Sequence, residues 1–268
     1  MDGDSHVTTV SAIVIVRNNE RMIARCIESL RWADEIVVVD SGSRDRTPDI
    51  CRSLGAQVHV TSDWPGHGPQ KNRALDRATC DWVVSVDSDE WITPALQAEI
   101  VRTIAQADAL NGYAMPRRSS FCGRPMQHSG WWPDYVLRLF RRAHGRFTDD
   151  PVHERLVVQG TVGRLREPIM HEAIVDLDQM VEKMNAYSSS SALVRLERGA
   201  RAGLATAVLH GAWTFFRTYV LRAGFLDGRE GFILAVANAE GSYYRYLKLM
   251  LLREQRSRGK GEGVKGEG

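Results

Sequence analysis

The chain has 268 residues, of which 43% are hydrophobic and 25% are charged, with a formal net charge of +2. This composition predicts a globular protein with a sizeable core and argues against disorder except at the ends. Cys26, Cys51, Cys80 and Cys122 have neither C-x-x-C nor zinc spacing, so we expect free thiols in a reducing compartment. No export signal and no run of ~18 to 20 apolar residues is found, so we expect a chain that is neither exported nor membrane-spanning.

The first hundred residues alternate between strand and helix patterns. Apolar runs predict strands at 10–16, 35–40, 56–61 and 81–87. Helical spacing or helix punctuation predicts helices at 19–33, 46–55 and about 70–78, the second with Thr47 as N-cap and Pro48 at its first position. This alternation predicts an α/β fold with a parallel, doubly wound sheet.

The pattern changes after residue 111. Residues 112–171 show short strands, turns and arginines, which predicts antiparallel additions to the same sheet. Residues 179–258 have helical periodicity, and the Gly-rich, charged end at 259–268 is expected to be disordered. The sequence therefore predicts an α/β domain over 1–178 and a helical extension over 179–258.

Acidic residues follow two of the predicted strands. Asp40 ends the second strand and Asp87 ends the fourth. Ligands of parallel α/β sheets gather at the carboxyl ends of the strands, so we expect both acids to face one crevice.

The segment Asp87-Ser88-Asp89 can hold a divalent cation such as Mg²⁺ or Mn²⁺, because carboxylate oxygens suit these hard ions. The remaining coordination positions would accept the oxygens of a diphosphate. The alternative is a turn that caps the following helix. Thr93 is the better cap for that helix, so the alternative leaves the two aspartates unexplained.

Two further segments are candidates for nucleotide contacts. In Asp40-Ser41-Gly42, small residues let the main chain approach a flat ligand, and Asp45 follows closely. An Asx-type turn before a helix is the alternative. Lys71 and Asn72 suit ribose or phosphate contacts, with a solvated first helical turn as the alternative.

Four stretches together resemble the family 2 glycosyltransferases, and most closely the bacterial lipopolysaccharide inner-core glucosyltransferases. They are "SAIVIVRNNERMIARCIESL", "DEIVVVDSGSRDRT", "QKNRALDRATCDWVVSVDSDEW" and "PDYVLRLFRR". The resemblance implies a Rossmann-like GT-A fold, with a nucleotide-binding part at 10–95 and an acceptor part at 112–171. It also implies a UDP-hexose donor with glucose as the first candidate for the transferred sugar, a divalent metal and inversion at the anomeric carbon.

The resemblance also implies roles for three aspartates. Asp40 would contact the nucleobase, Asp87 would lie beside the nucleotide and share the metal site, and Asp89 would reach the metal. His153 is a candidate for completing the metal site, with a packed or surface histidine as the alternative.

An inverting transferase needs a carboxylate base on the acceptor side. We expect Asp134 to be this base, with Glu154 and Asp150 as the next candidates. Between Arg117 and Arg146, Asp134 is the single acid among seven arginines, which could bind an anionic acceptor. The same arginines would lower its pKa, and an ion pair with Arg138 or Arg141 is the alternative.

From His210 to Lys260 there are nine basic and four acidic residues, interleaved with aromatic ones. This pattern predicts a cytoplasmic protein attached peripherally to the inner face of the cell membrane, with a lipid-linked, anionic acceptor and no nucleic-acid partner. Helices that pack on the catalytic domain or on a second subunit are the alternative. We expect two sets of residues at the lipid surface, namely Phe215, Phe216, Tyr219, Phe225, Tyr243, Tyr244 and Tyr246, with Arg217, Arg222, Arg245, Lys248 and Arg253.

Three other functions are alternatives to sugar transfer. A D-x-D phosphatase usually has its motif near the N-terminus, and a nucleotidyltransferase would want a glycine-rich loop where this chain has "VRNNERM". A non-catalytic sugar- or lipid-binding module would be supported by loss of the metal acids, which are present.

Overall fold

The computed structural model describes residues 8–150 and 154–262, with the main chain alone for 258–262, and divides into two compact units. Unit 1 comprises Met1–Arg118 and Pro133–His171, and unit 2 comprises Ser119–Trp132 and Glu172–Gly268.

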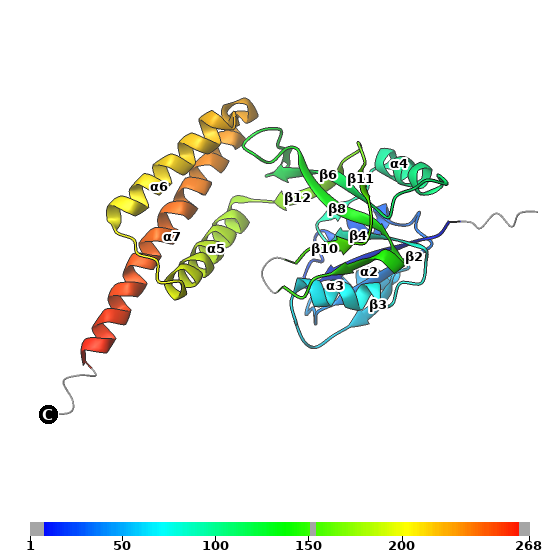
Figure 1. Ribbon diagram of the computed structural model, residues 1–268, viewed down its shortest axis with the longest axis horizontal. Coiled ribbons are helices and arrows are strands. Elements are labelled where there is room, and N and C mark those ends of the chain that lie inside the picture. Colours follow the sequence, from blue (N-terminus) through cyan, green and yellow to red (C-terminus); the bar gives the residue numbers. More distant parts are fainter. Residues whose placement is uncertain (1–7, 151–153, 263–268) are drawn as a thin grey trace, which may run out of the picture. The chain divides into compact units, whose positions relative to one another are not determined.

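Unit 1 is built on four parallel strands in the order β3-β2-β1-β4 (Figure 1). These strands are β1 (Val10–Val16), β2 (Glu35–Asp40), β3 (Gln57–Val60) and β4 (Trp82–Asp87). All of β1 is buried because successive residues point to opposite faces, each covered by a different core. On one face lie α1 (Ile23–Ser29), α2 (Thr47–Ser53) and α4 (Pro94–Ile104), and on the other lies α3 (His67–Leu75).

The predicted antiparallel additions are confirmed. Strand β8 (Asp134–Arg141) pairs antiparallel with both β4 and β6 (Gly112–Phe121), and β12 (Ile169–Ile174) pairs antiparallel with β5 (Glu90–Trp91). Strands β7 (Arg124–Pro125) and β11 (Val162–Arg164) also pair with β6. A separate two-stranded sheet joins β9 (Gly145–Phe147), which follows the 3-10 helix η1 (Arg142–His144), to β10 (Leu156–Val158).

The helix caps agree with the sequence in one case and differ in another. Thr93 caps α4 by accepting a hydrogen bond from the Leu96 amide, as expected. The prediction that Thr47 caps α2 is wrong, because Thr47 is the first helical residue and Arg46 occupies the N-cap position. The Thr47 hydroxyl instead accepts a hydrogen bond from the Asn19 amide, which ties the loop after β1 to α2.

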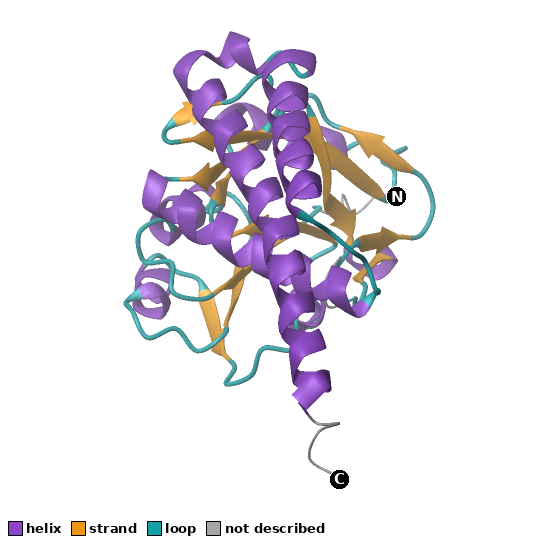
Figure 2. Ribbon diagram, turned by 90° about the vertical axis from the view of Figure 1, so that its left-hand side faces the viewer, coloured by secondary structure: helices purple, strands orange, loops and turns teal. Residues whose placement is uncertain are grey.

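Unit 2 is mainly helical. Its long helix α7 (Gly228–Glu262) packs against α5 (Leu177–Glu197) and α6 (Leu204–Phe216). Figure 1 labels these three helices, and Figure 2 shows the helices in purple from another side. A π-helical turn η2 (Arg217–Leu221) and a 3-10 turn η3 (Gly224–Asp227) connect α6 to α7. Helix α7 continues through 259–262, the start of the segment expected to be disordered. Within the described residues, every helix is too short or too polar to span a bilayer.

Candidate functional site

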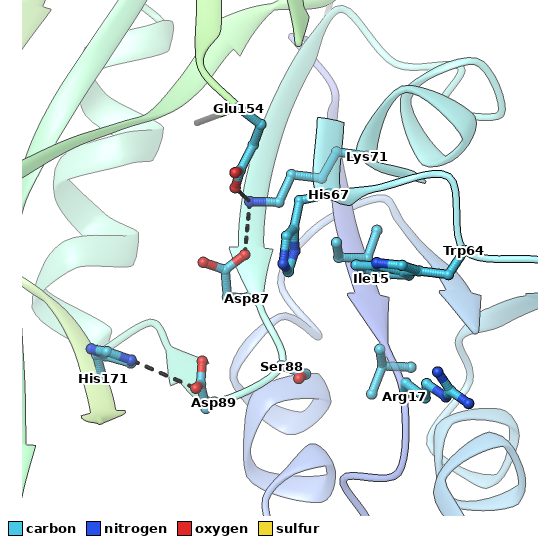
Figure 3. Close-up of a pocket in the computed structure, with 11 residues that line it drawn as sticks. Ile15, Arg17, Trp64, His67, Lys71, Asp87, Ser88, Asp89, Glu154 and His171 are labelled. Carbon is cyan, nitrogen blue, oxygen red and sulfur yellow. Dashed lines mark ion pairs between the residues drawn. The ribbon is translucent and has the colours of Figure 1, made fainter. Parts of the chain in front are cut away.

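The register of the parallel strands brings the two strand-end acids to the same edge. Val16 pairs with Asp40 and Ile15 pairs with Asp87, so both aspartates flank the end of β1. A pocket of about 350 Å³ opens at this edge, and we call it the edge pocket (Figure 3). Its lining includes Arg17, Trp64, His67, Lys71, Asp87, Asp89, Glu154 and His171.

Asp87 is neutralised by two cations of the protein itself. Its Oδ1 lies 3.0 Å from Lys71 Nζ, and its Oδ2 accepts a hydrogen bond from Arg138 Nη2. Burial alone would raise the pKa of Asp87, but Arg138 and Lys71 outweigh it and hold the pKa well below its usual range. A metal bound by Asp87 would have to share this carboxylate with Lys71 and Arg138.

Glu90 shares the same arginine. Its Oε1 lies 2.8 Å from Arg138 Nη2, and its Oε2 accepts the Asp87 amide at 3.0 Å. Burial raises the pKa of Glu90; Arg138 opposes this shift and the nearby Asp87 adds to it. Arg138 thus holds two acidic side chains together at the carboxyl end of β4.

Lys71 lies between Asp87 and Glu154, with its Nζ 3.5 Å from Glu154 Oε1 (Figure 3). Glu154 also lines a second pocket of about 380 Å³, which we call the arginine pocket because it contains Arg117, Arg138 and Arg155. Lys71 and Asp87 line both pockets as well. The two pockets therefore meet at the group Lys71, Asp87 and Glu154.

Asp89 points away from this group and toward His171, whose Nε2 lies 3.6 Å from Asp89 Oδ2 (Figure 3). The pairing of β12 with β5, which sets His171 opposite Glu90, brings the histidine there. Among the described residues, no three His, Cys, Asp or Glu side chains gather closely enough to hold a metal alone. Asp89 and His171 do fit a divalent ion that takes its other ligands from a diphosphate, since carboxylate and imidazole are both metal donors.

Sequence reasoning missed His171, and it named His153, which lies outside the described residues. A lone histidine in "PIMHEAI" carries no signal in the sequence, because its proximity to Asp89 depends on how β12 pairs.

Asp40 has the hydrogen bonds of the Asx-type turn. Its buried carboxylate accepts hydrogen bonds from the amides of Gly42 and Ser43 at 3.0 and 2.9 Å, and from the Ser43 hydroxyl. Gly42 has a φ of +75°, which favours glycine at this position. The Ser41 hydroxyl accepts a hydrogen bond from the buried Gln70.

Asp45 accepts hydrogen bonds from the amides of Thr47 and Glu20. Slight burial opposes its ionisation, but these hydrogen bonds outweigh the burial and lower the pKa of Asp45. Asp45 thus organises the start of α2.

Of the other predicted nucleotide contacts, Lys71 lines the edge pocket whereas Asn72 is engaged elsewhere. The Asn72 amide group donates to the Phe147 carbonyl and accepts from the Phe147 amide, at 2.9 and 3.0 Å. Asn72 therefore fastens α3 to β9.

Asp134 is held by Arg117, which donates from Nε and Nη2 to Asp134 Oδ2 at 3.0 and 2.6 Å. Asp134 is thus in an ion pair, as the alternative expected, but its partner is Arg117 and not Arg138 or Arg141. Neither Asp134 nor Asp150 is among the described residues that line the edge pocket or the arginine pocket.

The fold and the acidic edge pocket define an α/β enzyme with its ligand site at the carboxyl ends of parallel strands. The chain belongs to glycosyl transferase family 2, whose family model matches residues 11–161. It is therefore a family 2 glycosyltransferase with a GT-A fold, as the sequence resemblance implied, and the phosphatase and nucleotidyltransferase interpretations are excluded.

Relatives along most of the chain agree. The lipopolysaccharide core biosynthesis glycosyltransferase LpsC of Rhizobium meliloti is 32% identical over 249 residues, which cover 89% of each chain. An uncharacterized glycosyltransferase of Rickettsia felis is 29% identical and covers 91% of this chain and 89% of its own.

Among solved structures, the glucosyl-3-phosphoglycerate synthase of Mycobacterium tuberculosis, in complex with Mn²⁺, UDP-glucose and phosphoglyceric acid, is 27% identical with a TM-score of 0.37. That match covers 41% of this chain and 44% of the synthase.

Proposed function

We propose that this enzyme moves a hexose, with glucose as the first candidate, from a UDP-sugar to an anionic lipopolysaccharide-core or other lipid-linked glycan, with inversion. The observation that carries the proposal is the meeting of two polar pockets at Lys71, Asp87 and Glu154. One pocket can hold a donor and the other an acceptor, with a carboxylate between them.

The edge pocket suits the donor. Trp64 and His67 lie edge to face with ring centroids 4.8 Å apart, and Trp64 offers an exposed aromatic surface to a nucleobase. Arg17 supplies a cation to the ribose or phosphate side. Asp89 and His171 would hold Mg²⁺ or Mn²⁺, which when bound would neutralise the charge of the leaving diphosphate.

The arginine pocket suits an anionic acceptor, because Arg117 and Arg155 line it beside Glu154. We assign the role of base to Glu154 in place of Asp134, since Glu154 borders both pockets and Asp134 is bound to Arg117. Glu154 takes the proton of the acceptor hydroxyl while the oxygen of that hydroxyl bonds to the anomeric carbon. The bond from that carbon to the diphosphate breaks on the opposite face, and the nucleoside diphosphate leaves.

Donor binding tests the proposal. Titration calorimetry with a panel of UDP-sugars, with and without Mn²⁺, should show metal-dependent binding that Asp89→Ala and His171→Ala each weaken about tenfold or more. Asp108→Ala and His144→Ala, which lie outside the edge pocket, are the matched controls and should bind normally. Donor binding that does not depend on the metal would refute the donor site. Donor affinities of Asp89→Ala and His171→Ala equal to those of the control variants would refute it too.

We also propose that the enzyme works at the cytoplasmic face of the inner membrane, where a lipid-linked acceptor is found. Unit 2 supports this proposal, because its helices leave large apolar side chains exposed.

A further inference from the structure

Helix α6 has one face packed and one face bare. Ala207 and Gly211 are buried, and a Cβ on Gly211 would lie 3.3 Å from the Ala239 carbonyl oxygen of α7, so small residues let the two helices approach closely. The large apolar side chains around the rest of the helix are exposed, namely Leu204, Val208, Leu209, Trp213 and Phe216. Helical spacing puts Leu209, Trp213 and Phe216 opposite the buried residues. Apart from His210, α6 contains no ionisable side chain.

The exposed apolar surface continues past the end of α6. Val220 and Leu221 in η2 and Phe225 and Leu226 in η3 are also exposed. We call the exposed apolar residues of α6, η2 and η3 the α6 face. The turn beneath it is fixed, because the buried Asp227 accepts hydrogen bonds from the amides of Gln127 and His128.

The stretch of sequence that carries the α6 face has charges of one sign. No acidic residue occurs from 198 to 226, whereas Arg198 and Arg201 precede α6 and Arg217 and Arg222 follow it. An apolar stripe about 20 Å long with arginines at both ends matches the interface of an anionic bilayer.

We propose that the α6 face is the surface that inserts into an anionic bilayer, with α6 lying in the membrane plane. This inference rests on the proposed membrane location of the enzyme and names the residues responsible.

The residues of α7 that the sequence had suggested are mostly occupied within unit 2. Lys248 Nζ donates to Asn185, Ser188 and Ser189 of α5, and Arg253 donates to the Gly199 and Ala200 carbonyls. These two cations join α7 to α5 and to the loop that follows it, so we do not include them in the membrane-binding surface. Tyr246 is stacked on His210 with ring centroids 4.1 Å apart.

Vesicle flotation of the full chain, without donor or acceptor, tests the proposal independently of catalysis. The test variant is Leu209→Ser, which changes a leucine that is 69% exposed on α6. The matched control is Leu193→Ser, which changes a leucine that is 49% exposed on α5. Leu209→Ser should lower partition into phosphatidylglycerol-containing vesicles about tenfold, and the control should not. Equal partition of the two variants would overturn the proposal.

Two double variants test the electrostatic contribution of the arginines to membrane binding. Arg201→Gln/Arg217→Gln should lower partition at low salt by about fivefold for each arginine, and high salt should remove the difference. Arg31→Gln/Arg102→Gln makes the same charge change at exposed positions of unit 1 and should leave partition unchanged.

A second copy of the chain is the competing occupant of the α6 face. Sedimentation velocity without lipid distinguishes the two. A dimer that Leu209→Ser dissociates, together with no partition of the wild type into anionic vesicles, would overturn the membrane assignment. Quenching of Trp213 fluorescence by brominated lipid, absent in Trp213→Phe, is the result expected if the face inserts.

Discussion

Arg138 is the residue on which the acidic end of β4 depends, because it neutralises Asp87 and Glu90 at once. Removing one partner of a buried ion pair leaves an uncompensated charge. We therefore expect Arg138→Met to lower the free energy of unfolding by about 3 to 5 kcal/mol in urea titrations. Glu90→Gln in that background should restore part of it. Arg142→Met, at an exposed position, is the control, and an Arg138→Met loss no larger than that of the control would contradict this role.

Glu35 makes a separate prediction about pH. Partial burial opposes its ionisation, but hydrogen bonds from Ser11 and Thr79 outweigh the burial and lower the pKa of Glu35 below 4.5. A depressed carboxyl pKa stabilises the fold above the unfolded-state pKa, and this contribution disappears as the pH falls through the folded-state pKa. The stability difference between wild type and Glu35→Gln should therefore be constant near neutral pH and shrink below about pH 4.5. A difference that grows on acidification would contradict the assignment.

Helix α3 carries Lys71 into the site, and Gly68 controls how closely that helix approaches the chain before Glu154. A Cβ at Gly68 would lie 1.8 Å from the Thr148 carbonyl oxygen, which belongs to the main chain. Gly68→Ala should therefore cost about 1 to 3 kcal/mol of stability, measured by urea unfolding, and reduce transfer. Gly203→Ala is the matched control, because nothing lies within 4 Å of a Cβ there. Indistinguishable unfolding curves would show that the contact is not tight.

The elements differ in how far the sequence could predict them. Strands β1, β2 and β4 were predictable because continuous apolar runs between turn residues fit a sheet covered on both faces. The partners of Asp87 and Asp89 were not, since Arg138 and His171 arrive through the pairing of β8 with β4 and of β12 with β5. For α6, the sequence predicted a lipid-facing surface from His210 onward but left packing on the catalytic domain or on a second subunit open, because an apolar helix face fits either environment until its neighbours are known.

At the scale of the whole molecule, the proposed catalytic site and the proposed membrane-binding surface fall in different units. Both pockets lie in unit 1, which holds almost all of the residues matched by the family model, and the α6 face lies in unit 2. Variants of the α6 face should therefore change membrane binding while leaving donor binding intact.

The four free cysteines report on the native state of the whole chain. Cys26 and Cys51 are buried, and burial raises the pKa of Cys51 to about 11, so both should resist thiol reagents until the protein unfolds. Cys122 is exposed and should react first, followed by Cys80. Mass spectrometry after timed labelling gives the order. Reaction of Cys26 or Cys51 as fast as Cys122 in buffer would contradict the buried core.

The central claim is that Glu154, between the two pockets, is the base of a sugar transfer. Its most direct test is the transfer rate of Glu154→Gln compared with that of Asp134→Asn, with donor affinity measured for both. Because the amide keeps the shape but cannot take the proton, Glu154→Gln should retain donor binding and lose about 10² or more in rate. Asp134→Asn should lose less. Wild-type turnover by Glu154→Gln would contradict the assignment. A Glu154→Gln rate only slightly below that of the wild type, together with an inactive Asp134→Asn, would also contradict it.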